Sequence, residues 1–324
     1  MNTDNIIVQV SHLTKNFNNF TAVDGIDFAV HEGEIFGFLG PNGAGKTTTI
    51  NMLTGLARPT SGQIAYLGAD YTKDIKRAQP LLGIVPDESN LYEKLDGFEN
   101  LGFCAALYGM PKSEREPRAR QLLEQFSLTD AGKRPFKFYS KGMKRKLTVA
   151  AGIIHQPKIL FLDEPTTGID VASARQIRAL IRQLNESGTT IFMTTHYIEE
   201  AERLCHRIAF IVNGKIIRIG SVPELMQHVQ QDHILQFTFA DAVQLPPDVE
   251  SQFPGCAVSR LNENMLRVQS PQPLPLMPLM QFFEGRSMNV LEARIIKPSL
   301  EEVFVRLTGV EAGEMKKDKE GQKK

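Results

Sequence analysis

Short apolar runs alternate with stretches of helical periodicity along the first two-thirds of the chain. Three runs of strand length span Gly33–Gly40, Lys158–Pro165 and Thr189–His196. Helical character appears between them in Lys46–Leu56 and Ala172–Leu184. Apolar strands that alternate with helices are typical of a mostly parallel sheet covered on both faces. The pattern therefore predicts an α/β domain.

The texture of the chain changes at two further places. Residues 91–150, approximately, are charged and helix-rich without strong strand runs, and they predict a helical insertion into an α/β domain of residues 6–225. Residues 226–310 predict the order β-α-β-β-α-β, which is a small α+β domain of the ferredoxin-like type. Residues 311–324 are strongly charged and predict a disordered tail.

Composition narrows the class of partner. The 324 residues carry 37 Lys and Arg against 37 Asp and Glu, so the formal net charge is zero and nucleic acid is not an expected partner. The cysteines Cys104, Cys205 and Cys256 lack metal-site spacing and indicate reduced thiols in the cytoplasm. The N-terminus lacks a signal-peptide pattern, and no apolar run approaches the ~18 residues of a membrane span. We therefore expect any membrane role to come through a partner.

The clearest chemical signal is "GPNGAGKTTT", which matches the phosphate-loop pattern G-x-x-x-x-G-K-[ST]. It follows an apolar strand and opens a helix, as the mechanism requires. Backbone amides of such a loop face a polyphosphate, the lysine reaches the β- and γ-phosphates, and the first threonine ligates Mg²⁺. The residues expected to bind ATP here are Gly40, Pro41, Asn42, Gly43, Ala44, Gly45, Lys46, Thr47 and Thr48. Lys46 is also expected to be catalytic, and Thr47 to bind the metal.

A second signal is the pair Asp163–Glu164 at the end of the apolar run "ILFLDEP". Ligands of open α/β sheets bind at the carboxyl ends of the strands. We expect Asp163 to hold Mg²⁺ and Glu164 to orient or deprotonate the attacking water. The alternative is a solvated strand end, and the phosphate loop favours the functional interpretation.

His196 ends the third strand run at the same expected edge. A neutral imidazole there is able to hydrogen-bond a γ-phosphate oxygen, which would make His196 catalytic. The alternative is a histidine at a strand–helix junction with a merely structural hydrogen bond. Three strands that deliver Lys46, Glu164 and His196 to one edge favour the catalytic role.

The segment "YSKGMKRKL" predicts a helix N-terminus capped by Ser140. Free amides beside a glycine form an anion site, but no strand pattern leads into this segment. Its cations are Lys141, Lys144, Arg145 and Lys146. We interpret them as a solvated helix face rather than as an RNA-binding patch.

Together these motifs resemble those of ABC-type ATPases, and the resemblance covers roughly residues 6–225. It implies a P-loop NTPase fold with an antiparallel β edge region. Ser140 and Gly142 match the family's signature motif, from which Tyr139, Lys141 and Met143 depart. The resemblance implies that this motif faces the ATP of a second copy, so that two nucleotides lie in a two-fold, head-to-tail dimer.

Other positions carry over from the same resemblance. Phe17 corresponds to the aromatic residue that stacks on adenine; the alternative is a core phenylalanine. Gly168 and Asp170 resemble the loop that contacts the other subunit. Asp87 occupies the position of the family's usual Gln and is expected to serve the metal. The alternative for Asp87 is a side chain that points into solvent or caps the following segment.

The C-terminal part, including "KPSLEEVFVRLTG", resembles the branch of daunorubicin-resistance and sodium-efflux ATPases. That branch serves separately encoded, multi-span permease subunits. The resemblance implies an ATP-hydrolysing exporter subunit held peripherally at the cytoplasmic face of the membrane. The alternative is a soluble ABC ATPase that acts on ribosomes or nucleic acid. The chain carries one phosphate loop and no long heptad repeat, which favours transport.

Overall fold

The computed structural model describes residues 5–227, 233–296 and 299–310. By its internal contacts the chain divides into two units. One comprises Met1–Val222 and the chain from Leu307, and the other comprises Pro223–Arg306. The expected domain bounds of 6–225 and 226–310 stay predictions, and their boundary falls within helix α7 (Val222–Gln227). The expected tail, 311–324, lies outside the described residues.

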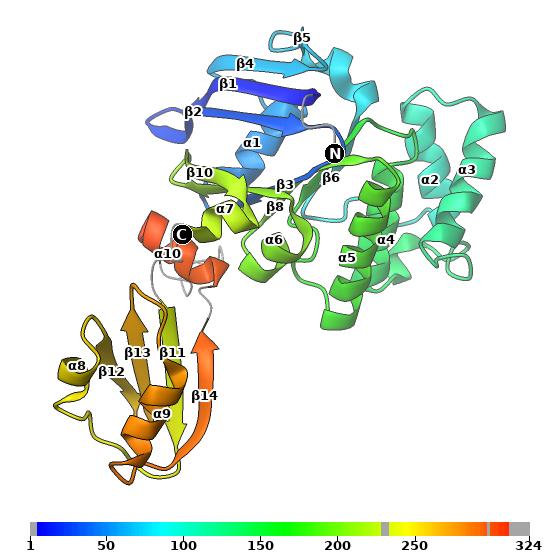
Figure 1. Ribbon diagram of the computed structural model, residues 1–324. Helices are drawn as coiled ribbons and strands as arrows, with labels where there is room; N and C mark the ends of the chain where they lie inside the picture. The colour runs from blue at the N-terminus through cyan, green and yellow to red at the C-terminus, as the bar shows by residue number, and fades with distance from the viewer. Residues whose placement is uncertain (1–4, 228–232, 297–298, 311–324) are drawn as a thin grey trace. The chain divides into compact units, whose positions relative to one another are not determined.

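The first unit contains a six-stranded, mostly parallel sheet in the order β10-β9-β3-β8-β7-β6 (Figure 1). Its strands are β3 (Ile35–Leu39), β6 (Leu82–Val85), β7 (Ile159–Asp163), β8 (Thr190–Thr195), β9 (Arg207–Val212) and β10 (Lys215–Ser221). β10 joins the sheet antiparallel to β9. Every residue of β3, β7 and β8 is buried, as expected for strands covered on both faces.

A four-stranded antiparallel sheet in the order β2-β1-β4-β5 forms the second layer of this unit. Its strands are β1 (Ile6–Phe17), β2 (Phe20–His31), β4 (Ser61–Tyr66) and β5 (Ala69–Asp70). An aromatic cluster joins the two sheets, because Phe28 of β2 lies 5.7 Å from Phe36, 5.1 Å from Phe38 and 5.8 Å from Phe192 between ring centroids. Such pairs add about 0.5–1.5 kcal/mol each beyond area burial.

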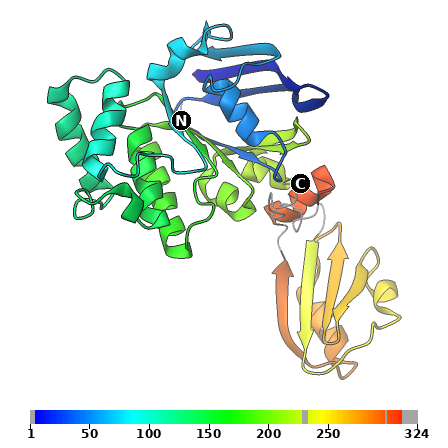
Figure 2. The same cartoon turned by 180° about the vertical axis from the view of Figure 1, so that it is seen from behind.

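Helices cover the parallel sheet and form the expected insertion (Figures 1 and 2). They are α1 (Lys46–Leu53), α2 (Gly97–Leu107), α3 (Lys112–Gln125), α4 (Lys141–Gly152), α5 (Val171–Glu186) and α6 (Ile198–Leu204). Residues 91–150 hold α2, α3 and most of α4, and no named strand lies among them. The helix expected to reach Leu56 ends at Leu53, because Gly55 adopts a left-handed conformation (φ +81°) that stops a helix.

The second unit has the element order β11, α8, β12, β13, α9, β14 that the sequence predicts for a split βαβ domain. Its elements are β11 (His233–Phe239), α8 (Val249–Gln252), β12 (Ala257–Asn262), β13 (Met265–Ser270), α9 (Leu276–Glu284) and β14 (Val290–Ile296). The antiparallel sheet order is β12-β13-β11-β14. Leu235 and Phe237 of β11 pack with Phe283 of α9 in a separate core. Helix α10 (Leu300–Thr308) follows.

Candidate active site

The phosphate loop, residues 40–45, connects β3 to α1. Gly45 precedes α1 with φ +100°, and a Cβ on it would lie 2.5 Å from the carbonyl oxygen of Ala22. A side chain is therefore excluded at Gly45 by backbone conformation and by space. No side chain caps the N-terminus of α1, so the loop and the helix start present backbone amides rather than a capping hydroxyl.

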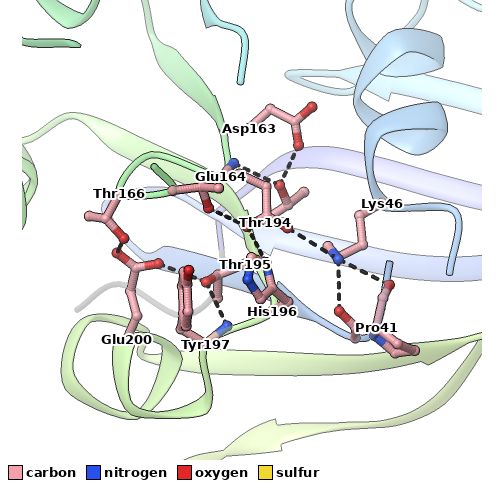
Figure 3. Close-up of polar contacts among 12 residues, drawn as sticks. Pro41, Lys46, Asp163, Glu164, Thr166, Thr194, Thr195, His196, Tyr197 and Glu200 are labelled. Atoms are coloured by element: carbon pink, nitrogen blue, oxygen red, sulfur yellow. Dashed lines mark hydrogen bonds and ion pairs between the residues drawn. The ribbon is translucent and has the colours of Figure 1, made fainter. Parts of the chain in front are cut away.

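Lys46 begins α1 and is 5% exposed. Its Nζ donates to the carbonyl oxygens of Gly40 at 2.7 Å and Pro41 at 3.1 Å, and it lies 3.2 Å from Oε1 of Glu164 (Figure 3). The ammonium is thus held by its own loop and by the end of β7. A bound phosphate would compete with these acceptors for the same cation.

Glu164 follows β7 directly and faces the ends of two neighbouring strands. The strand order β3-β8-β7 places the phosphate loop, His196 and Glu164 at one edge of the sheet. Oε2 of Glu164 accepts hydrogen bonds from Nδ1 of His196 at 2.7 Å and from the Thr167 hydroxyl at 3.0 Å. The three expected catalytic residues are therefore in contact.

Burial opposes ionisation of Glu164, but the hydrogen bond from His196 and the charge of Lys46 outweigh it and hold the pKa of this carboxyl at about 2. Glu164 is therefore ionised at neutral pH. Its backbone is unusual as well, because Glu164 has a φ of +48°, in the left-handed region that residues other than glycine seldom adopt. The amide of Glu164 donates to the carbonyl and hydroxyl oxygens of Thr194, at 3.2 and 3.1 Å, which holds this conformation.

The contact with Glu164 fixes the tautomer of His196. An ionised carboxylate only accepts hydrogen bonds, so Nδ1 of His196 carries the proton. A neutral ring then has no second N–H for a phosphate oxygen. The expected hydrogen bond from His196 to a γ-phosphate oxygen stays a prediction. Such a bond requires either the imidazolium or the release of Nδ1 from Glu164.

Asp163 ends β7 and offers oxygen to a metal. It is 4% exposed, and its Oδ1 accepts a hydrogen bond from the Thr194 hydroxyl. Thr47 is exposed at the first turn of α1. Within the described ranges, no group of three or more His, Cys, Asp or Glu could hold a metal ion alone. One carboxylate and one hydroxyl fit Mg²⁺, which commonly takes its other ligands from phosphate and water.

Arg145 corrects the interpretation of the basic cluster as a solvated face. It is 3% exposed, and its guanidinium donates to the carbonyl oxygens of Asp163 at 2.7 Å and Pro165 at 2.8 Å. It also donates to the carbonyl oxygens of Pro86 and, at 3.0 Å, Asp87. One buried cation therefore binds both neighbours of Glu164 and the loop after β6. Burial lowers the pKa of Arg145, and the carboxylate of Asp87 acts against that shift.

Asp87 is exposed on the loop after β6, and its expected role as a metal ligand stays a prediction. Its charge acts on Arg145, while Arg145 binds its carbonyl oxygen. Through Arg145, Asp87 therefore links the loop after β6 to helix α4, whether or not its carboxylate binds a metal.

Glu200 is a second buried group that sequence reasoning missed. Its carboxylate accepts hydrogen bonds from the hydroxyls of Thr166 and Thr195, both at 2.7 Å, and it is 3% exposed (Figure 3). It thereby joins the segment after Glu164 to the segment before His196. Burial raises the pKa of Glu200 despite these two hydrogen bonds. The signal was the polar end of β8, where two threonines precede a histidine.

The signature residues belong to a second contact, between α4 and α5. Ser140 caps α4, because its hydroxyl oxygen accepts a hydrogen bond from the backbone amide of Met143 at 3.2 Å. A Cβ on Gly142 would lie 2.2 Å from Oγ of Ser173, and that hydroxyl donates to Asp170 at 2.7 Å. The hydrogen bonds from Ser173 lower the pKa of Asp170, which caps α5. Gly142 and Asp170 are thus brought together through Ser173.

Phe17 lies at the end of β1, next to the turn to β2, and it is 49% exposed. The alternative of a core phenylalanine is therefore wrong. Lys15 places its Nζ 4.8 Å from the centre of the Phe17 ring. Because Lys15 pairs with Val23, and Ala22 lies against the phosphate loop, this hairpin begins beside the loop. Adenine stacking on Phe17 stays a prediction.

Comparison with known proteins decides the family. A family model described as "ABC transporter" matches residues 23–167. The linearmycin resistance ATP-binding protein LnrL of Bacillus subtilis is 36% identical over 306 residues, which cover 94% of this chain and 98% of that protein. The chain belongs to the ABC transporter ATP-binding family. As an ABC ATPase, it binds and hydrolyses ATP.

Further relatives of this ABC ATPase agree. The daunorubicin/doxorubicin resistance ATP-binding protein DrrA of Streptomyces peucetius is 36% identical and covers 93% of this chain, over 92% of its own length. A solved ATP-binding subunit of an ABC transporter superposes with a TM-score of 0.63 at 27% identity, covering 69% of this chain and 93% of that one. These findings confirm the expected ABC ATPase fold and the resemblance to resistance-type ATPases.

We predict that Arg145 maintains the ABC ATPase fold around Glu164. Arg145→Met should lower the free energy of unfolding by about 3 kcal/mol, because buried carbonyl oxygens lose a charged donor. Arg145→Lys should recover part of this loss, since an ammonium cannot span all four carbonyls. Urea unfolding of the purified proteins measures both effects. Lys141→Met is the matched control, because Lys141 is exposed on α4. If Arg145→Met were as stable as Lys141→Met, the structural role of Arg145 would be contradicted.

A second prediction concerns the contact between Gly142 and Ser173. Gly142→Ala should destabilise the protein by about 1–3 kcal/mol, because the new Cβ overlaps Ser173. Ser173→Gly removes the obstructing atoms, so the double variant should be more stable than the sum of the single effects predicts. Unfolding of all four proteins gives the coupling energy, and strict additivity would rule out the contact. Inactivity of Gly142 variants alone would therefore not identify a contact with a second copy.

Proposed function

We propose that this ATPase is the energy-supplying subunit of a membrane exporter. It binds separately encoded multi-span subunits at the cytoplasmic face of the membrane. The observation that carries the proposal is similarity over nearly the whole chain, including the C-terminal unit, to a protein named for linearmycin resistance. Resistance by export requires a machine that couples ATP to transport. None of the described helices has the length and hydropathy of a membrane span.

In this proposal the phosphate oxygens of ATP replace the carbonyl oxygens and the Glu164 carboxylate that now contact Nζ of Lys46. Lys46 binds the β- and γ-phosphates, and the backbone of residues 40–48 surrounds them. Asp163 and Thr47 hold Mg²⁺, with Asp87 as a further candidate ligand; the metal supplies charge neutralisation to the phosphates. Phe17 stacks on adenine.

Glu164 acts on the attacking water after Lys46 has left it. A carboxyl with a pKa of about 2 is a weak base, because the hydrogen bond from His196 and the charge of Lys46 both stabilise its ionised form. Transfer of Lys46 to phosphate removes one of them and raises the basicity of Glu164. The carboxylate then orients the water and accepts its proton, while His196 keeps the carboxylate in position.

Two copies enclose the nucleotides in the proposed active form. Ser140, Gly142 and Asp170 of one copy complete the site that the phosphate loop of the other copy begins. The support is that Gly142 and Asp170 meet at Ser173, and that Ser140 caps the same helix as Gly142, on helix ends separate from Lys46. The helical insertion transmits closure of the dimer to the membrane subunits.

We predict that Glu164→Gln keeps nucleotide binding and lowers turnover by roughly 10²-fold or more, the usual scale for loss of a general base. The amide has nearly the same shape but accepts no proton. ATP binding by fluorescence and steady-state phosphate release measure the two properties. Glu199→Gln is the control, because Glu199 is an exposed carboxylate of α6 with 83% side-chain exposure. Wild-type turnover in Glu164→Gln would remove Glu164 from its role.

The transport function predicts a specific partner. Solubilised native membranes should yield a multi-span protein with the tagged chain, and deletion of that protein's gene should abolish ATP-dependent efflux in vesicles. Detergent extracts of cells that express an untagged chain provide the control. Ribosomal proteins or DNA in place of a multi-span protein would favour the soluble alternative.

A further inference from the structure

Strand β14 forms one edge of the sheet in the second unit (Figure 2). Among the described residues it pairs with β11 alone. Leu291 and Ile295 of this strand are each 67% exposed, although Ile295 lies opposite the buried Leu235. An edge strand with exposed aliphatic side chains is a template for pairing with another chain. A feature of its sequence indicates which chain that is.

The sequence of β14, "VLEARII", is complementary to itself about Ala293. If two copies of β14 pair antiparallel with Ala293 at the centre, Glu292 lies opposite Arg294 of the partner subunit. Leu291 would lie opposite Ile295 of the partner subunit in the same register, although the pairing of β14 with β11 is irregular at Leu291, so the charged pairs carry the argument. Cross-strand pairs of opposite charge and of aliphatic residues both stabilise a sheet. A two-fold axis repeats each favourable pair, as an isologous interface requires.

The side chains of Glu292 and Arg294 are already arranged on one face. Ala293 packs against the core below α9, so its two neighbours project from the opposite face of the strand. Nη2 of Arg294 lies 2.8 Å from Oε1 of Glu292, and both side chains are at least half exposed. In the paired form each carboxylate would meet the guanidinium of its own strand and that of the partner. The four charges sum to zero.

Charge also selects this register over its neighbours. A shift of the two-fold centre to Glu292 places two carboxylates directly opposite each other. A shift to Arg294 does the same with two guanidinium groups. Like charges directly opposite destabilise a pair of strands. A shift of the pairing by one residue would place a side chain that belongs to the core face of one strand opposite a solvent-facing side chain of the other. Such a shift is disfavoured because paired residues of a pleated sheet share one face.

We propose that two copies of this chain associate edge to edge through β14, with antiparallel pairing centred on Ala293. This joins two four-stranded sheets into one of eight strands. The association uses neither the nucleotide nor the phosphate loop, so it goes beyond the proposed function and does not depend on it. It would keep two ATPase subunits paired when no nucleotide is bound.

A charge-exchange experiment on the full chain tests the proposal. Glu292→Arg places Arg opposite Arg in a homodimer, and Arg294→Glu places Glu opposite Glu. Sedimentation velocity without nucleotide and with EDTA should show a dimer for the wild type. Each single variant should raise the dimer dissociation constant by about tenfold or more, because two attractive pairs become repulsive. Both positions are exposed, so circular dichroism should be unchanged.

Mixing the variants gives the decisive comparison. In a heterodimer of Glu292→Arg with Arg294→Glu, every charge faces its opposite, so the mixture should recover the wild-type dissociation constant. The double variant that carries both substitutions should recover it as a homodimer. A wild type that stays monomeric over the tested concentrations would overturn the proposal. Variants that dimerise as tightly as the wild type, or a mixture without recovery, would overturn it as well.

Discussion

A buried carboxylate held between an ammonium and an imidazole is the interaction on which the catalytic edge depends. Glu164 is 7% exposed and ionised, and such a charge is stable in the interior only when it is paired. Lys46 and His196 supply the pairing from two other segments. The order β3-β8-β7 and the aromatic core between the sheets keep these segments adjacent. Arg145 fixes the chain on both sides of Glu164.

Lys46 therefore takes part in both the ion pair of this structure and the proposed binding of phosphate. By pairing with Glu164, the proposed base, Lys46 stabilises the ionised carboxylate and weakens it as a base. Phosphate is the stronger competitor for an ammonium that is already within reach. In the proposed mechanism, nucleotide binding would draw Lys46 away from Glu164 and raise the basicity of this carboxylate. Mg²⁺ binding by Asp163 fits the same edge, because Thr194 orients this carboxylate.

Much of this edge was predictable from sequence because each motif couples residue type to strand position. Lys46, Asp163, Glu164 and His196 each follow or end a strand, and parallel strands end at one edge. Arg145 was missed because four cations in one segment were interpreted as one surface. Helical periodicity could have separated Arg145 from the other cations, since Arg145 lies three residues from Gly142 and Thr148 and so shares their buried face of α4. Its partners are backbone carbonyl oxygens, which leave no trace in side-chain patterns.

The tautomer of His196 and the contact of Gly142 with Ser173 were not predictable for a different reason. Both depend on distances between segments that lie far apart along the chain. The second unit shows the opposite case. Its element order followed from strand and helix patterns. The symmetry of β14 is also visible in the sequence, but it indicates an interface only when the strand is known to form an edge of the sheet.

The most direct measurement is a structure of the wild-type protein with a non-hydrolysable ATP analogue and Mg²⁺. We predict that Nζ of Lys46 leaves Glu164 and the carbonyl oxygens of Gly40 and Pro41 and binds phosphate oxygens. His196 should remain on the carboxylate. A nucleotide bound away from residues 40–48, or a Lys46 still paired with Glu164 beside bound phosphates, would contradict it.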